Sequence, residues 1–336
     1  EGRRVFVRVE WRNDADQVLA TDGGIEQIML VVDGMPTPVD VLDEDTAPRI
    51  WQAKHGISQE WADKLVNEMG VSPTLPLSYD RVTGATLRTL GDLAAEPPGS
   101  VEESFHFVLN DTVMLDNRIP PYGYRYDDAR ARNALPLPET QYGNPGAGGE
   151  NDFVDRVSLR APDGATRSTI EVLYEGVTWE YAWFLKRANN GSVSYLAAEG
   201  DRFMDAWLNS DVSSEAVVAS LEWVDPWRDL EQGLAGTHGL PVLKGAGTLV
   251  EGTPVVLGLT NALGSTPAYL VVGFAEANLP FGGGILVPDP APPGFVQALG
   301  AGHSGSIQVS GTWPAGVPGE FTTWFQCWIE DPGAPW

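Results

Sequence analysis

The sequence predicts a mainly-β protein made of two β-sandwich-like domains, the first with short helical insertions. Short runs in which apolar and polar residues alternate are typical of half-buried strands. Glycine and proline separate these runs as turn residues, and residues 241–336 contain 17 Gly and 12 Pro. The composition also changes near residue 240, since residues 1–240 contain 60 charged side chains and residues 241–336 contain seven. We therefore expect domains at 1–235 and 241–336, with a Gly-rich linker at 233–240.

The first domain is expected to open with a strand at residues 3–11. Its sequence, RRVFVRVEW, alternates with the period of two that separates the faces of a strand. One face would consist of Val5, Val7, Val9 and Trp11, and the other of Phe6, Arg8 and Glu10. Similar runs predict further strands at 27–32, 104–115 and 168–174.

Short helices are expected between these strands, at 58–69, 178–187 and 201–209. The first begins on Ser58, a residue typical of helix N-caps, and carries Trp61, Leu65 and Met69 at intervals of four on one face. The second begins in the same way on Thr178. Strands interrupted by single short helices do not form an alternating βαβ series, so we expect a β-sandwich with helical insertions.

The second domain consists almost entirely of short strands between turns. They are predicted at 253–260, 268–274, 284–287, 305–311 and 320–330. In the last of them, the residues expected to face the core are Phe321, Thr323, Phe325, Cys327 and Ile329. Cys327 would then be a small buried hydrophobic residue rather than a reactive thiol.

Charge and cysteine content exclude several classes of function. There are 46 acidic and 21 basic side chains, a net charge of −25, which would repel nucleic acid and anionic membranes. No apolar run is long enough to cross a bilayer as a helix. A single cysteine excludes an internal disulfide framework and a C-x-x-C-H haem-attachment motif, so no cofactor is expected to be covalently bound in this chain.

Four segments within roughly the first 210 residues carry a common family pattern. They read EGRRVFVRVEW at 1–11, IWQAKHGI at 50–57, FHFVLNDTVMLDNRIPPYG at 105–123 and TIEVLYEGVTWEYAWFL at 169–185. In this order they resemble the haem-free C-terminal region of large exported multihaem c-type cytochromes, and the third segment is the strongest match. Residues 268–332 separately resemble a C-terminal β-domain of secreted proteins from planctomycete- and myxobacterium-like bacteria.

This resemblance implies a haem-bearing partner. The family carries its haem motifs upstream of the matching region, so haem would belong to another domain or subunit, or this lineage would have lost it. It also implies export to the periplasm, the outer surface or the extracellular space. A bis-histidine haem can take its distal ligand from elsewhere. His55, in an expected loop, and His106, on the expected strand at 104–115, are therefore candidate haem ligands in trans.

The third segment should also contain a corner. Pro120 and Pro121 fix their φ angles and bias the preceding residue away from a helix, so the strand must stop there. Asn117 and Arg118 can then bond backbone groups across the corner.

Two acidic turns are candidate calcium sites, because hard oxygen ligands at close spacing in loops suit Ca²⁺. The first contains Asn13, Asp14 and Asp16, and the second contains Asp43, Glu44 and Asp45. Neither follows the twelve-residue helix–loop–helix pattern, and solvated loop acids are common, so both interpretations stay open.

Several common catalytic and nucleotide-binding motifs are absent from the sequence. There is no G-x-S-x-G nucleophile elbow, H-E-x-x-H zinc motif or phosphate-binding loop, so we expect no catalytic activity. Our leading hypothesis is a non-catalytic structural or interaction module of an exported multihaem cytochrome system, which supports electron transfer or subunit assembly and could self-associate. The alternative is a surface adhesion or carbohydrate-binding module, in which some of the 12 tryptophans would stack on sugars and calcium could stabilise the loops.

Overall fold

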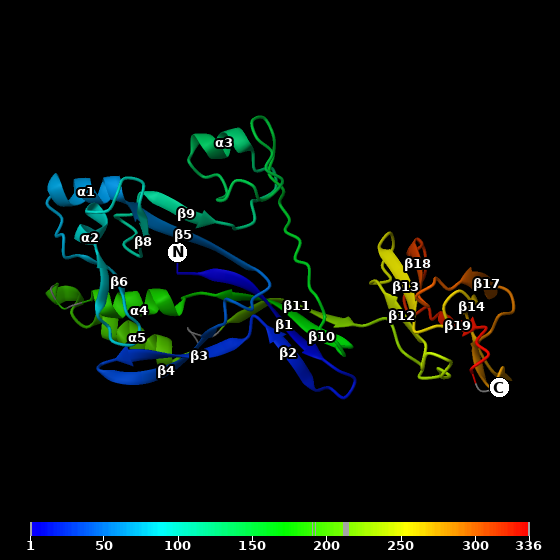
Figure 1. Ribbon diagram of the computed structural model, residues 1–336. Helices are drawn as coiled ribbons and strands as arrows, with labels where there is room; N and C mark the ends of the chain where they lie inside the picture. The colour runs from blue at the N-terminus through cyan, green and yellow to red at the C-terminus, as the bar shows by residue number, and fades with distance from the viewer. Residues whose placement is uncertain (1, 190, 192, 211–214, 335–336) are drawn as a thin grey trace. The chain divides into compact units, whose positions relative to one another are not determined.

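The computed structural model divides the chain into two compact units and describes residues 2–189, 191, 193–210 and 215–334 (Figure 1). The first unit is Glu1–Val224 and the second is Asp225–Trp336. Strands far outnumber helices, and the paired strands run antiparallel, so the prediction of a mainly-β fold is confirmed. Within the described ranges, no helix combines the length and apolar character that crossing a membrane requires.

A seven-stranded sheet organises the first unit. Its main order is β11 (Ala216–Val224), β10 (Arg167–Glu175), β1 (Arg4–Arg12), β5 (Ile50–Ser58) and β8 (Val101–Glu103). Off this path, β2 (Val18–Asp22) pairs with β1 and β9 (Thr112–Asp116) pairs with β5. Strand β1 lies at the centre, because β10 pairs along its whole length while β5 and β2 share its other edge.

The two faces of β1 are both partly apolar. Val7, Val9 and Trp11 are buried together with Ala165 on the face that the alternation predicts. The opposite face carries Arg8 and Glu10, yet Phe6 is fully buried there with Leu42 and Leu173. The chain folds back over this face at the end of β4 (Met35–Leu42), and a single strand cannot reveal that contact.

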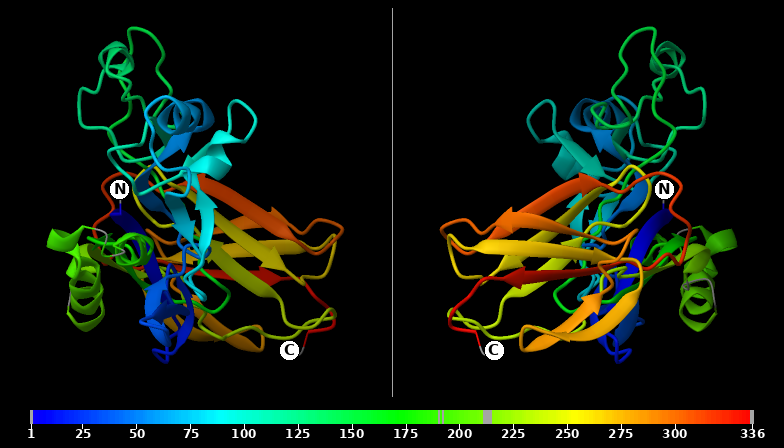
Figure 2. Two further views of the ribbon diagram at one scale, coloured as in Figure 1. Left: turned by 90° about the vertical axis from the view of Figure 1, so that its left-hand side faces the viewer. Right: turned by 90° about the vertical axis from the view of Figure 1, so that its right-hand side faces the viewer.

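Two helix pairs, the separate short helix α3, a 3₁₀ turn and two hairpins complete the first unit. The hairpins are β3 (Ile25–Val32) with β4, and β6 (Pro76–Tyr79) with β7 (Thr86–Thr89). The helices are α1 (Gln59–Asn67), α2 (Leu90–Ala94), α3 (Tyr126–Ala131), α4 (Trp179–Ala188) and α5 (Glu199–Asn209), with one 3₁₀ turn at Ser194–Leu196. Figure 2 shows α1 and α2, in light blue to cyan, at a different place in the unit from α4 and α5, in green.

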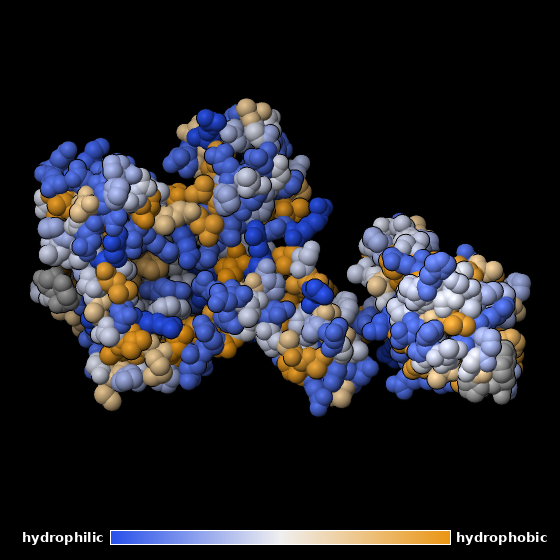
Figure 3. Space-filling view, viewed as in Figure 1, coloured by the Kyte–Doolittle hydropathy of each residue, from blue (hydrophilic) through white to orange (hydrophobic). Residues whose placement is uncertain are grey.

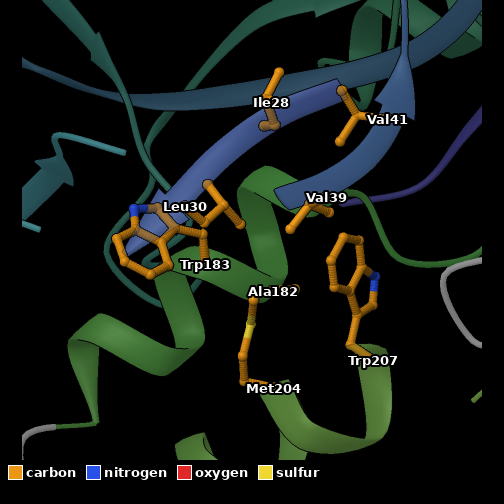
Figure 4. Close-up of a cluster of buried hydrophobic side chains, with 8 residues drawn as sticks. All are labelled: Ile28, Leu30, Val39, Val41, Ala182, Trp183, Met204 and Trp207. Atoms are coloured by element: carbon orange, nitrogen blue, oxygen red, sulfur yellow. The ribbon is translucent and has the colours of Figure 1, made fainter. Parts of the chain in front are cut away.

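The β3–β4 hairpin packs on α4 and α5. Figure 4 shows the apolar side chains of the hairpin directed toward Trp183, Met204 and Trp207 of the two helices. The Trp207 indole also donates a 3.1 Å hydrogen bond to the Val177 carbonyl. Thr178 caps α4 as predicted, since its hydroxyl accepts a hydrogen bond from the Tyr181 backbone N–H.

Helix α1 confirms the predicted start but not the predicted end. The Ser58 hydroxyl accepts a hydrogen bond from the Trp61 backbone N–H, which is the expected cap. Leu65 is buried against α2 and β6, but Met69 is 62% exposed. The helix ends at Asn67, so Met69 leaves the face that the spacing of four predicts.

The expected strand at 104–115 is interrupted, so that prediction is wrong in its first half. Strand β8 ends at Glu103, β9 begins at Thr112, and the residues between them form a turn. The backbone N–H groups of Leu109 and Asn110 both donate to the His106 carbonyl. Asn110 also bonds the Ser104 carbonyl through its side chain, and such local bonds compete with a strand ladder.

The second unit contains two three-stranded sheets and a hairpin. The sheets are β12 (Val242–Ala246), β13 (Pro254–Thr260) and β18 (Ile307–Thr312), and β17 (Phe295–Gly300), β14 (Pro267–Gly273) and β19 (Trp324–Ile329). The hairpin is β15 (Glu276–Phe281) with β16 (Gly284–Pro288). One apolar cluster contains Leu257 of the first sheet and Leu270, Val272 and Phe325 of the second. The two sheets therefore share a core.

Three details of the second unit differ from the expectation. Strand β19 begins at Trp324, so Phe321 lies outside it and is 46% exposed. Cys327 is half-buried rather than fully buried, and this burial raises the pKa of its thiol to about 11. The expected linker is held in place, because the backbone N–H and hydroxyl of Thr237 both donate to the Asp331 carboxylate.

The boundary between the units also lies earlier than the composition indicates, between residues 224 and 225. The segment that follows the boundary belongs to the second unit because Trp227 packs in its core beside Phe325. The Trp227 indole donates a 2.9 Å hydrogen bond to the Gly247 carbonyl. Charge content could not locate this boundary, since the residues around Trp227 remain as charged as the first unit.

Candidate functional site

The four segments that carry the family resemblance meet at one recess in the first unit. Its lining consists of residues 2–4, 52–55 and 103–105 with Thr178, Glu180 and, from the second acidic turn, Glu44. The antiparallel pairing explains this convergence, because β5 runs beside both the start of β1 and β8. The recess has about 30 Å³ of space for water, enough for about two water molecules. Its floor is therefore a packed arrangement of side chains and not a cavity for a substrate.

A buried arginine lies at the base of the recess. Arg4 is 2% exposed, and its register on β1 places it opposite Glu175 of β10 and Gln52 of β5. Its Nε donates to the Glu175 carboxylate and its Nη1 donates to the Glu44 carboxylate. The Glu180 carboxylate lies 3.7 Å from the same Nη1. One guanidinium thus faces three carboxylates, an arrangement with excess negative charge when all three are ionised.

The burial of this cluster changes its protonation. Burial raises the pKa of Glu175 to about 7, although Arg4 opposes the change by attracting the ionised form. Burial raises the pKa of Glu180 as well. Burial also acts to lower the pKa of Arg4, but the surrounding carboxylates raise it overall, so the arginine stays charged. The cluster therefore tends to hold a proton on one carboxylate near neutral pH.

Two atoms of the cluster are buried without a hydrogen-bond partner among the described protein atoms. They are Nη2 of Arg4 and Oε2 of Glu180. Buried polar atoms of native proteins usually bond to protein or to ordered water. A donor and an acceptor beside a recess of this size are suited to hold water.

His55 lies on the wall of this recess. The sequence indicates a loop there, whereas the structure places His55 on β5, opposite Val113 of β9, so the loop prediction is wrong. The ladder continues through His55 because β8 and β9 both pair with the end of β5. The neighbouring Lys54 ammonium lies 3.6 Å from the Glu103 carboxylate. Of the two candidate haem ligands, His55 is the one that lines the recess.

His106 occupies a different environment. Its Nε2 lies 2.8 Å from the Pro76 carbonyl oxygen, and its ring packs edge-on against Phe184 at 4.9 Å between centroids. Burial lowers the pKa of His106. The Nε2 atom is thus hydrogen-bonded inside the unit, and His106 is not among the residues that line the recess. The ligand role of His106 gains no support from its placement.

An aromatic cluster joins the 104–110 turn to α4. Phe105 packs against Tyr181 and Phe184 at centroid distances of 5.4 and 5.6 Å, and Phe107 packs against Tyr181 at 5.3 Å. These contacts hold the turn beside the recess that Phe105 lines. At its tip, Phe107 is 45% exposed and Val108 is 97% exposed. We call the recess and this turn together the docking region.

The corner after β9 forms as predicted for Asn117. Its Oδ1 accepts a 2.7 Å hydrogen bond from the Gln52 backbone N–H, and its Nδ2 donates a 2.7 Å bond to the Ile50 carbonyl. The side chain thus continues the pairing with β5 where the strand itself has ended. Arg118 instead pairs with the Asp116 carboxylate at 2.6 Å.

The first candidate calcium turn is closed by its own hydrogen bonds. The Asn13 side-chain oxygen accepts 3.0 Å hydrogen bonds from the backbone N–H groups of Ala15 and Gln17. Asp16 has a φ of 62°, and its carboxylate lies 3.6 Å from the Arg12 guanidinium. Asp14 is exposed in the same turn.

The carboxylates of the second turn also bond to other groups of the protein. The Asp43 carboxylate accepts a 3.2 Å hydrogen bond from the Asp45 backbone N–H, while Glu44 pairs with Arg4. Across the part of the chain that the structure describes, no three His, Cys, Asp or Glu side chains are grouped as a metal ion would require. Calcium binding by either turn stays a prediction.

Sequence reasoning missed the cluster around Arg4, although one signal was present. Phe6 interrupts the otherwise polar face of β1, and Arg4 shares that face by the period of two. A large apolar residue there indicates that this face is covered, and therefore that Arg4 is buried beside it. The identity of its partners, Glu44, Glu175 and Glu180, depends on the fold.

The second unit contains one further histidine contact. His303 Nδ1 lies 2.6 Å from the Ser265 hydroxyl oxygen, across two loops. Both residues are exposed to solvent, whereas a serine nucleophile works in a site that excludes water and orients the base. We therefore assign no catalysis to this pair.

Comparison with known proteins does not extend these observations. No protein-family model matches the chain, and neither a curated protein nor a solved structure shows significant similarity to it. The resemblance to the cytochrome C-terminal region stays a prediction, and the function has to be argued from the docking region itself.

Proposed function

We propose that the protein is a non-catalytic structural and interaction module of an exported multihaem cytochrome system. The docking region would hold the haem-bearing domain or subunit. The observation that carries this proposal is the convergence of four separate segments on one recess that has little internal space. Residues gathered around a cavity of about 30 Å³ are suited to shaping a surface rather than to enclosing a substrate.

The exposed turn supports a role in binding a protein. Phe107 and Val108 form an apolar tip, and a partner that covered them would remove this apolar area from water. The aromatic contacts with Tyr181 keep the tip in one position, which reduces the entropy lost on binding. A rigid apolar anchor beside charged residues matches the usual organisation of a binding interface.

Charge supports a basic partner. The net charge of −25 would attract a partner with a basic surface and accelerate its association at low ionic strength. The haem itself belongs to the partner in this proposal, because the recess cannot enclose a porphyrin. His55 would meet the partner at the wall of the recess.

Purification from the native cells tests the proposal. The tagged chain, isolated at low salt, should carry a partner with a Soret absorption band, and high salt should release that partner. Val108→Asp should abolish the co-purified haem, because Val108 is 97% exposed and its replacement should leave the fold intact. Val82→Asp is the matched control, since Val82 is 58% exposed and lies outside the docking region. Absence of haem with the wild-type chain, or equal haem with both variants, would refute the proposal.

The alternative carbohydrate-binding function lacks a comparable observation. Sugar stacking needs an exposed aromatic face, and none of the tryptophans in the described residues is exposed. Tyr122 and Tyr195 are 82% and 88% exposed, but neither lines the recess. Binding of the folded protein to a glycan array would revive this alternative.

A further inference from the structure

The sheet of the first unit ends in an unusually apolar edge strand. Within the described residues, β11 pairs with β10 and has no strand on its other side. All of its nine residues except Trp223 are exposed. Val217, Val218, Leu221 and Val224 are between 54% and 64% exposed. Apolar atoms are scattered elsewhere on the surface (Figure 3), but here they follow one another along a single edge.

The two edge strands of this sheet differ in how well they are shielded from pairing with another chain. Folded proteins usually shield edge strands by shortness, charge, proline or bulges, because free backbone groups pair readily with another chain. Strand β8, at the other end, has three residues and carries Glu102 and Glu103. Strand β11 has no proline and one charged residue, Glu222, and its pairing with β10 skips Val218 as a bulge. From Ala219 to Val224 the edge is regular and unshielded.

We propose that β11 is an interface for a second copy of this chain, formed by antiparallel pairing around a two-fold axis at Leu221. This register would place Leu221 opposite its own copy and the large Trp223 opposite the small Ala219. It would also place Glu222 opposite Ser220, whose hydroxyl can donate to the carboxylate beside the 2.9 Å hydrogen bond that Glu222 already accepts from Thr169. The strand is thus complementary to itself in size and in hydrogen bonding.

Charge selects this register over its neighbours. A two-fold axis at Glu222 would place two carboxylates directly opposite each other in a protein that already carries a net charge of −25. An axis at Ser220 would bring Glu222 against Val218 at the bulge, where the ladder is irregular. The axis at Leu221 keeps Glu222 away from both its own copy and the bulge, and pairs Ala219–Trp223 along the regular part of the strand. Only the terminal Val224 then falls opposite the bulge at Val218.

Sedimentation of the full chain tests the interface. We expect a reversible dimer at micromolar concentrations, and Leu221→Lys should raise its dissociation constant at least about tenfold, because two ammonium groups would then meet at the axis. Val82→Lys is the matched control, since it adds the same charge at an exposed valine elsewhere in the first unit. A wild-type chain that stays monomeric throughout would overturn the proposal.

Cysteine cross-linking tests the register independently of any effect on folding. In a Cys327→Ser background, Leu221→Cys should form a disulfide-linked dimer on mild oxidation, because directly opposite residues lie within the Cα distance that a disulfide spans. Ser220→Cys should not, since its expected neighbour is Glu222. Preferential linkage through residue 220 would reject this register. About half of the β11 amides bond β10 and are protected in any case, so only the amides that point away from β10 are informative. Protection of those amides in a monomer would show that the chain covers the edge itself, and would reject the interface.

Discussion

Replacing Glu175 by glutamine should change how the stability of the first unit depends on pH. Glu175 is 5% exposed and shares Arg4 with two other carboxylates, and burial raises its pKa from 4.5 to about 7. Because its pKa is higher in the folded state, the folded state binds the proton more tightly than the unfolded chain. This contribution to stability is fully present below pH 4.5 and is lost as the pH rises through 7.

The size of the effect follows from the two pKa values. Between pH 8 and pH 5, proton binding by Glu175 should add about 2.5 kcal/mol to the free energy of unfolding. Glutamine has the shape of a protonated glutamate and can still accept a hydrogen bond from Arg4, but it does not titrate. The stability of Glu175→Gln relative to wild type should therefore improve by about 2.5 kcal/mol from pH 5 to pH 8.

Urea unfolding of the full chain, followed by circular dichroism at a series of pH values, measures this difference. Only the difference in unfolding free energy between variant and wild type is informative, because carboxylates with a lowered pKa make stability change with pH in the opposite direction. Asp331 is an example, since hydrogen bonds from Thr237 lower its pKa. Glu171→Gln is the matched control, since it removes a carboxylate from the same strand that pairs with Arg8. A stability difference for Glu175→Gln that is constant between pH 5 and pH 8 would refute the reasoning.

Three further predictions concern single side chains. Asn117→Ala should lower the free energy of unfolding by about 1–3 kcal/mol in urea titrations, because the backbone groups of Gln52 and Ile50 lose their partner. Trp207→Ala should lower it by about 3–5 kcal/mol, since the indole is 2% exposed in the core between hairpin and helices. Cys327, whose pKa is raised from 9.0 to about 11 by burial, should react with iodoacetamide at pH 8 about a hundredfold more slowly in the folded chain than in urea.

Each of these predictions has a control in the same chain. Arg118→Ala removes a neighbour of Asn117 whose side chain is 63% exposed, and should change stability by less than about 0.5 kcal/mol. Met69→Ala should be equally mild, because Met69 is 62% exposed although its spacing suggests a core position. Equal losses for target and control variants, or equal alkylation rates for folded and unfolded Cys327, would contradict the contacts described above.

Much of the local structure could be predicted from the sequence because short-range physics decides it. Alternation determined strands β1 and β10, and the hydroxyl groups of Ser58 and Thr178 determined where helices α1 and α4 begin. These features depend on residues within a few positions of each other. The prediction failed at 104–115, where hydrogen bonds within the turn compete with the β pattern.

The candidate site could be predicted only in part. Four of the segments that meet at the recess had been singled out for a family resemblance, which stays a prediction, and His55 was among the candidates. A loop was expected where β5 continues. Arg4 and its carboxylates escaped notice because Glu44, Glu175 and Glu180 are far from it in the chain. A burial-dependent pKa such as that of Glu175 has no signature in the sequence.

The sequence by itself thus determined the fold class, about half of the strands and the strongly acidic character of this protein. Tertiary structure alone decided that residues 2–4, 52–55 and 103–105 share one recess with Glu44, Thr178 and Glu180. It also decided that, among the described residues, no strand pairs with the outer edge of β11. The physical reason is the distance along the chain over which each interaction acts. Alternation and capping act between neighbours along the chain, whereas burial and strand order depend on segments that meet only when the sheet assembles.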